Sequence, residues 1–258
     1  MQKKLVEEFI LSQFERQVAQ DELSAFDENT NIDWVSRTRA TIDEFLVDAC
    51  DLAEYIEKKV PERLNSPIYI EELFEKNIQK LTSTVQDEAW IKQIRQYIST
   101  NRELSSNLES QQVSAEIQRE VAKFAQYNGK MYSNGNSIFP DFLYHDRDYL
   151  ELPFQDRKKT VHGPCLQGKK NPRPSNVPDG IELKTNRSNR MRIDAHAPHI
   201  GLHLGFTWDA EPDGRILING AWLGYITESD HAESARNSKT TTVKYSFGHN
   251  KFISLLSN

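Results

Sequence analysis

The stretch Val177–Ser188, VPDGIELKTNRS, contains the strand around which the rest of the fold can be placed. Successive side chains of a β-strand point to opposite faces, so Ile181 and Leu183 share one face and Glu182 and Lys184 share the other. The apolar pair can pack on a hydrophobic core, which leaves a carboxylate and an ammonium about 7 Å apart along the strand. The stretch therefore predicts a strand that is buried on one face and offers two charged groups to a cleft on the other.

The chain of 258 residues changes in composition near its middle. Residues 1–128 contain 15 Lys and Arg against 24 Asp and Glu, whereas residues 129–258 contain 17 against 14. All 11 glycines and all 7 histidines lie in the second half. A basic surface that faces a ligand is therefore expected in the second half, although the net charge of the whole chain is -6.

The two halves also differ in hydrophobic periodicity. Apolar residues recur at helical spacing in the first half and predict helices over residues 1–17, 41–60, 68–81, 87–98 and 114–128, with Pro61 marking the exit of the second and Ser114 the start of the last. Short runs rich in β-branched and aromatic residues predict strands over residues 137–145, 180–185, 201–208, 215–226 and 240–247. The expected fold is α/β, with a helical region at 1–113, suited to dimerisation or DNA clamping, followed by a core at 114–258.

The sequence predicts neither a membrane protein nor a secreted protein. No apolar run approaches the roughly 20 residues that a membrane-spanning helix needs, and acidic residues interrupt the apolar residues at the N-terminus, unlike in a signal peptide. The two cysteines, Cys50 and Cys165, lie far apart in the sequence and are expected to be reduced. We therefore expect a cytoplasmic protein.

A carboxylate that can bind a metal ion and a nearby lysine are groups that metal-assisted hydrolysis of a phosphodiester uses. Such a site usually has more than one carboxylate, so Glu182 needs a second acidic residue beside it. Asp179 lies three residues earlier, where strand alternation points it to the opposite face, and it suits the turn before the strand. The other Pro-Asp pair is Pro140-Asp141, within the strand expected at 137–145. If that strand pairs with the strand at Glu182, Asp141 stands beside Glu182 on the same face.

This arrangement, Pro140-Asp141 followed by Glu182-Leu183-Lys184, resembles the PD-(D/E)xK nuclease superfamily, and within it the type II restriction endonucleases. The resemblance covers roughly residues 115–210. It implies a restriction-endonuclease-like core, with a central mixed β-sheet flanked by helices. It also implies that Asp141 and Glu182 bind Mg²⁺ and that Lys184 acts at the attacking water. An acid on the preceding helix assists in many members, and Glu120 is preferred over Glu116 because it is nearer the strand.

Basic and amide side chains in three segments are candidates for contact with DNA. Arginine suits guanine edges, asparagine suits adenine, and either can bind phosphate, so base readers and phosphate contacts cannot be separated at this stage. The candidates are Lys169, Lys170 and Arg173 in the basic tract before the strand, Asn186, Arg187, Asn189, Arg190 and Arg192 at its end, and Arg236, Asn237 and Lys239 near the C-terminus.

A zinc site is the alternative for the histidines of HAPHIGLH, His196, His199 and His203. Pro198 and Gly201 disfavour the helix that would bring the three to one face, and no cysteine or acidic cluster completes a ligand set. The favoured interpretation is that one histidine contacts a phosphate or lies near the scissile bond, and that the others are structural.

Together these features predict a type II restriction endonuclease, which hydrolyses phosphodiester bonds of double-stranded DNA at a specific short sequence with Mg²⁺. Because duplex DNA has two antiparallel strands and the chain shows one site, a two-fold homodimer is expected. Two alternatives stay open. A structure-specific or repair nuclease would use the same residues, and a non-catalytic DNA-binding protein would need the basic face but neither Glu182 nor Lys184.

Overall fold

A computed structural model describes residues 2–24, 31–66, 102–128, 131–133, 142–144, 180–195, 201–211, 215–227, 229–230 and 245–256. Within these ranges three long helices precede the strands: α1 (Gln2–Ser24), α2 (Asn31–Leu64) and α5 (Arg102–Asn128). The strands are β1 (Met131–Ser133), β2 (Phe142–Tyr144), β3 (Gly180–Arg187), β4 (Ile193–Ala195), β5 (Gly201–Ala210), β6 (Ile216–Ile226), β7 (Tyr245–Phe247) and β8 (Ile253–Ser254), with a 3-10 turn η3 (His249–Lys251) before the last.

The helix predictions over residues 1–17, 41–60 and 114–128 are confirmed in position but not in length. The expected exit at Pro61 is wrong, because α2 continues to Leu64. Proline removes one N–H from the helix, but its carbonyl still accepts a hydrogen bond, here from the backbone N–H of Asn65 at 3.0 Å. The expected start at Ser114 is also wrong, since α5 begins at Arg102. The helices predicted over residues 68–81 and 87–98 lie outside the described residues.

The strands form a six-stranded sheet in the order β1-β2-β3-β5-β6-β8, and β4 pairs with β7 separately. Strands β3 and β5 are parallel, and the other neighbours are antiparallel, so the sheet is mixed and the molecule is α/β, as predicted. The predicted pairing of the strand around residue 142 with the strand of Glu182 is confirmed, because Phe142 pairs with Ile181. Strands β1, β4 and β8 are too short for the periodicity of the sequence to reveal them.

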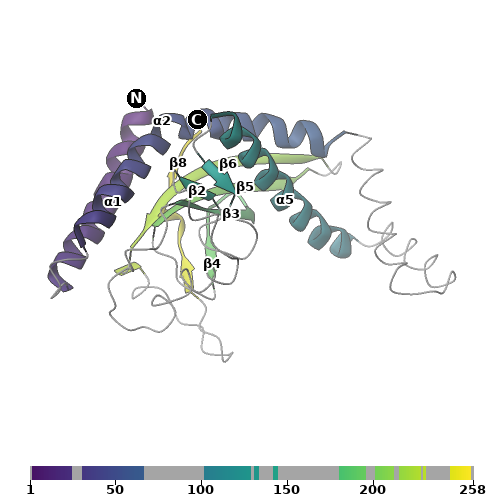
Figure 1. Cartoon of the computed structure of the whole chain (residues 1–258). Coiled ribbons are helices and arrows are strands. Elements are labelled where there is room, and N and C mark those ends of the chain that lie inside the picture. Colours follow the sequence, from purple (N-terminus) through teal and green to yellow (C-terminus); the bar gives the residue numbers. More distant parts are fainter. Residues whose placement is uncertain are drawn as a thin grey trace, which may run out of the picture.

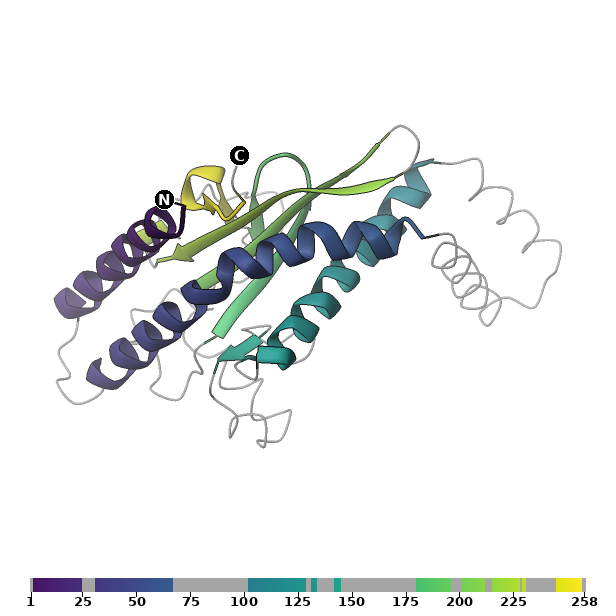
Figure 2. The same cartoon turned by 90° about the horizontal axis from the view of Figure 1, so that it is seen from above.

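One face of the sheet is covered by the helices (Figures 1 and 2). Leu202, Leu204 and Phe206 alternate along β5 and are buried with apolar residues of α1, α2 and α5 in a single hydrophobic core. The domain boundary expected between residues 113 and 114 falls inside α5. The described helices and the sheet therefore share one core across that boundary.

The opposite face of the sheet carries glycines over which side chains pack closely. A methyl group at Gly205 would lie 2.5 Å from the sulfur of Met191, and one at Gly224 would lie 2.7 Å from the ring of Phe252. Met191 and Phe252 are buried there with Ile193 and Ile226 in a second, smaller cluster. This face is thus only partly apolar, and the polar residues of β3 lie on it.

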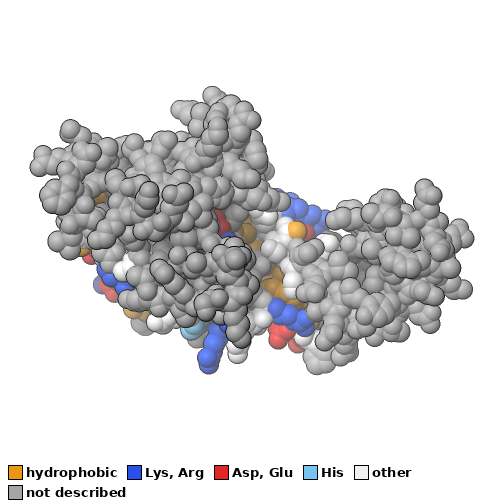
Figure 3. Space-filling model, turned by 90° about the horizontal axis from the view of Figure 1, so that it is seen from below, with side chains coloured by type: hydrophobic (Ala, Val, Ile, Leu, Met, Phe, Trp, Pro, Cys, Tyr) orange, Lys and Arg blue, Asp and Glu red, His pale blue; other side chains and the backbone are white. Residues whose placement is uncertain are grey.

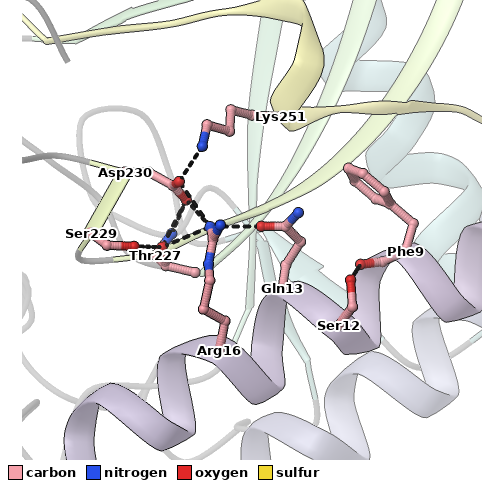
Figure 4. Close-up of polar contacts among 8 residues, drawn as sticks. All are labelled: Phe9, Ser12, Gln13, Arg16, Thr227, Ser229, Asp230 and Lys251. Atoms are coloured by element: carbon pink, nitrogen blue, oxygen red, sulfur yellow. Dashed lines mark hydrogen bonds and ion pairs between the residues drawn. The ribbon is translucent and has the colours of Figure 1, made fainter. Parts of the chain in front are cut away.

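A buried ion-pair cluster ties α1 to the C-terminal part of the chain (Figure 4). The carboxylate of Asp230, which is fully buried, accepts hydrogen bonds from Arg16 at 2.8 Å and from Lys251 at 2.6 Å. It also accepts from the backbone N–H and the hydroxyl of Thr227, both at 2.8 Å. Because these partners come from α1, the end of β6 and η3, the cluster joins three elements that are distant in sequence.

Among the residues that the structure describes, no helix has the length and apolarity required to cross a membrane.

Candidate functional site

Glu182 and Lys184 lie on the face of β3 that is turned away from the helices. Their strand neighbours Ile181 and Leu183 belong to the helix-covered core, so alternation puts the charged pair on the other side. The carboxylate of Glu182 is buried, at 5 % exposure, and forms an ion pair with the ammonium of Lys184. Figure 3 shows the molecule from this underside, where side chains of both charge types are visible between the grey atoms.

Asp141, the second carboxylate of the predicted site, lies outside the described residues. Its sequence neighbour Phe142 opens β2, is fully buried, and pairs with Ile181 of β3. Leu143 pairs with Gly180 in the same antiparallel register. The structure therefore brings the segment that follows Asp141 directly against the strand of Glu182.

Glu120 is buried on α5, where it joins that helix to α2. The hydroxyl of Tyr55 donates to its Oε2 at 2.9 Å, and Lys123 donates to its Oε1 at 2.7 Å. Burial by itself would raise the pKa of Glu120, but the hydrogen bonds from Lys123 and Tyr55, with the charge of Arg119, outweigh it and lower the pKa. Burial and the bond to this anion raise the pKa of Tyr55. Glu120 is therefore ionised at neutral pH.

Glu116, the other helix acid considered, is held in a similar way by ion pairs with Arg119 and with Arg63 of α2, the latter at 3.3 Å. Ile117 and Val121, between and beside the two acids, pack in the helix-covered core. Both acids thus have salt-bridge partners within the helical layer, and a role for either in metal binding stays a prediction.

The candidate DNA-contacting residues at the end of β3 fall into two groups. Arg187 contacts β5: its Nε donates to Asp209 at 3.2 Å, and its guanidinium lies 5.4 Å from the centre of the Trp208 ring. Asn189, Arg190 and Arg192 are exposed in the bend that follows the strand. Arg187 thus has partners on β5, whereas Asn189 and Arg190 are exposed in the bend.

The side chain of Asn186 helps to fix the backbone of this bend. Its Oδ1 accepts a hydrogen bond from the backbone N–H of Arg192 at 3.1 Å. In the same bend, the hydroxyl of Ser188 accepts a hydrogen bond from the backbone N–H of Arg190, also at 3.1 Å. These two bonds fix the backbone from which both arginine side chains project.

The other predicted site residues lie outside the described residues. They are Lys169, Lys170 and Arg173 in the basic tract, Arg236, Asn237 and Lys239 near the C-terminus, and His196 and His199 of the alternative zinc site. The third histidine of that alternative, His203, lies within strand β5 and not on a helix. Within the described ranges no group of three or more His, Cys, Asp or Glu side chains is arranged to hold a metal ion.

His203 is the residue of this face that the sequence did not assign to the carboxylate site. It is 1 % exposed and is the direct neighbour of Glu182 in the parallel pairing of β3 with β5. The alternation of side chains in GLHLGFTW puts His203 on the face opposite to Leu202 and Leu204. This alternation was the one sequence signal that His203 lies on a polar face. The pairing of β3 with β5 could not be read from that pattern.

Comparisons with known proteins add no relative: no protein-family model matches the chain, and searches of curated proteins and of solved structures found no significant match. The chemistry of the face must therefore be judged from its own residues. A buried carboxylate is a hard oxygen ligand that suits Mg²⁺. A neighbouring lysine can orient a water molecule or stabilise negative charge on a phosphate.

Proposed function

We propose that the protein is a type II restriction endonuclease of the PD-(D/E)xK kind, which hydrolyses double-stranded DNA at a specific short sequence with Mg²⁺. The observation that carries the proposal is the position of Glu182 and Lys184. They share one face of β3, next to the antiparallel strand β2 that Asp141 directly precedes in the sequence.

Asp141 is the proposed second carboxylate. In an antiparallel pair, one step back along the first strand corresponds to one step forward along the second. If the register that pairs Phe142 with Ile181 is extended by one residue, Asp141 would be the counterpart of Glu182. Directly opposite residues of a sheet place their Cβ atoms about 5 Å apart on the same face. At that spacing the two carboxylates would be able to share a ligand.

Asp141 and Glu182 supply the oxygen donors that a Mg²⁺ site requires. When bound, Mg²⁺ would polarise the phosphate and lower the pKa of a coordinated water. Lys184 holds the Glu182 carboxylate by its ion pair and presents an ammonium on the same face. It would orient the attacking water and stabilise the charge on the phosphate. Water is added across one P–O bond, and the departing oxygen leaves with a proton.

The DNA would lie along the underside of the sheet, where the bend after β3 offers exposed Asn189, Arg190 and Arg192. A two-fold homodimer would place one site on each strand of the duplex. The helical layer, which covers the other face of the sheet, would then serve the scaffold and the dimer.

Digestion of long duplex DNA tests the proposal. With Mg²⁺ we expect discrete fragments of plasmid DNA, and with excess EDTA we expect no cleavage. A smear, or cleavage only at junctions or damaged sites, would favour a structure-specific or repair nuclease. DNA binding without cleavage under any divalent cation would indicate a non-catalytic DNA-binding protein and overturn the proposal.

The bend after β3 gives a prediction with an internal control. Arg190→Ala should weaken DNA binding about tenfold, because a hydrogen bond to a charged group contributes about 1.5 kcal/mol. It should also reduce the salt dependence of binding by about one counterion. Arg187→Ala should change neither quantity, because its guanidinium is engaged by Asp209 and Trp208. Fluorescence anisotropy at several salt concentrations measures both quantities, and equal losses in Arg190→Ala and Arg187→Ala would contradict this distinction.

A further inference from the structure

His203 lies beside Glu182 in the sheet and is almost completely buried. The parallel register pairs its Cα with that of Glu182, so the two side chains lie on the same face of neighbouring strands. On its other side His203 pairs with Gly224 of β6, which has no side chain. Of the two residues that flank His203 across the sheet, Glu182 alone therefore offers a side chain.

The orientation of the imidazole ring is set by a hydrogen bond within β5. Nδ1 of His203 lies 2.9 Å from the carbonyl oxygen of Gly201. A carbonyl oxygen can only accept, so Nδ1 carries the hydrogen and donates. In the neutral ring the lone pair that can bind a cation then belongs to Nε2.

Gly201 is suited to this contact by its backbone. It opens β5 with a φ of 133°, a conformation that side chains disfavour and glycine tolerates. The next residue of the same face after His203 is Gly205, over which the sulfur of Met191 packs. The backbone of Gly201 thus places the carbonyl oxygen that Nδ1 of His203 contacts.

The hydrogen bond of Nδ1 to a backbone carbonyl is of the kind that metal-binding histidines make. Histidines that coordinate metals almost always donate their other ring N–H to a carboxylate or a backbone carbonyl, which fixes the tautomer and orients the ring. Neighbouring strands are about 4.8 Å apart, a separation that lets a carboxylate and an imidazole on paired residues reach one cation.

We propose that His203, through Nε2, is a ligand of the divalent cation that Glu182 holds. This inference rests on the metal site of the proposed function and deepens it. An imidazole ligand suits transition-metal ions better than Mg²⁺, which prefers oxygen donors. The site would therefore bind Mn²⁺ or Co²⁺ more tightly than Mg²⁺ because of His203.

Titration of the full-length protein with Mn²⁺, followed by electron paramagnetic resonance in the absence of DNA, tests the inference without an activity readout. His203→Gln should lower the affinity for Mn²⁺ about tenfold or more, since even outer-shell partners of metal ligands contribute about 10–100-fold. Its affinity for Mg²⁺, measured by competition, should change much less. The control is His249→Gln, because His249 is exposed and packs on Trp222.

A second measurement does not depend on the folding of a variant. Pulsed electron paramagnetic resonance of Mn²⁺ bound to the wild-type protein should show coupling to an imidazole nitrogen, which His249→Gln retains. Absence of that coupling, or wild-type Mn²⁺ affinity in folded His203→Gln, would overturn the role of His203. If Glu182→Gln weakens Mn²⁺ binding and His203→Gln does not, only this inference fails. If neither variant weakens it, or no cation binds, the proposed metal site fails as well.

Discussion

Glu182→Gln is expected to reduce the rate of DNA cleavage by about a thousand-fold. Charge stabilisation by a catalytic metal is worth several kcal/mol, and each 1.36 kcal/mol corresponds to a factor of ten in rate. Glutamine keeps the shape of the buried side chain but removes the charge that would hold the cation and that pairs with Lys184 in this structure. The rate is measured on a plasmid substrate at saturating Mg²⁺.

The control for this change is Glu62→Gln, which neutralises an exposed glutamate of α2 that pairs with Lys59 at 2.8 Å. It should cleave DNA at the wild-type rate. Circular dichroism and the affinity for DNA in the presence of EDTA should be close to wild type in both variants, which separates a catalytic defect from misfolding. Undiminished cleavage by folded Glu182→Gln would remove Glu182 from the site and overturn the assignment of the catalytic residues to β3.

Asp230→Asn is expected to lower the free energy of unfolding by about 3 kcal/mol. Removing one partner of a buried ion pair leaves an uncompensated charge and costs about 3–5 kcal/mol. The lower end applies, because the side chains of Arg16 and Lys251 keep 39 % and 18 % of their exposure to water. The substitution also weakens the acceptor for both hydrogen bonds from Thr227. Urea denaturation at pH 7 measures the loss.

The matched control is Asp43→Asn on α2. Asp43 also pairs with an arginine, Arg39, at 2.9 Å, but both side chains of this pair are more than two-fifths exposed. An exposed pair of this spacing contributes about 0.5 kcal/mol or less. A loss in Asp230→Asn no greater than the loss in Asp43→Asn would show that the cluster in Figure 4 does not hold α1 to the C-terminal strands.

The wild-type protein and Asp230→Asn should also differ in how their stability depends on pH. Burial tends to raise the pKa of Asp230, but hydrogen bonds from Lys251 and Thr227 and the charge of Arg16 lower it below the ordinary value. A carboxyl whose pKa is lower in the folded state stabilises the protein above its unfolded pKa, about 3.9 for aspartate, and this stabilisation is lost as the pH falls through the folded pKa. The stability difference between wild type and Asp230→Asn should therefore shrink below about pH 4.

The local elements of this chain were largely predictable. β3, β5 and β6 appear where alternation and β-branched residues predicted them, because one apolar face in each must be buried. The lengths of α2 and α5 were not, because helix ends depend on tertiary packing: Pro61 and Ser114 have local preferences that the surrounding core overrides. The predicted pairing of β2 with β3 followed from the need for a second carboxylate.

The candidate site divides in a similar way. That Glu182 and Lys184 share a face follows from their spacing of two along a strand. Other contacts depend on the tertiary structure. Arg187 contacts Asp209 and Trp208 because of where β5 lies. Asn186 holds the bend at Arg192 because of how the chain turns after β3. No spacing in the sequence encodes those contacts.

The sequence by itself determined the strand, the identity of the charged pair and the basic character of the segment after it, because these are properties of neighbouring residues. Only the tertiary structure decided that His203 stands beside Glu182, through the parallel pairing of β3 with β5. It alone joined Arg16 to Asp230 across more than two hundred residues. Such contacts depend on how distant segments pack to bury apolar surface. The local pattern of each segment does not determine the register in which two segments pair.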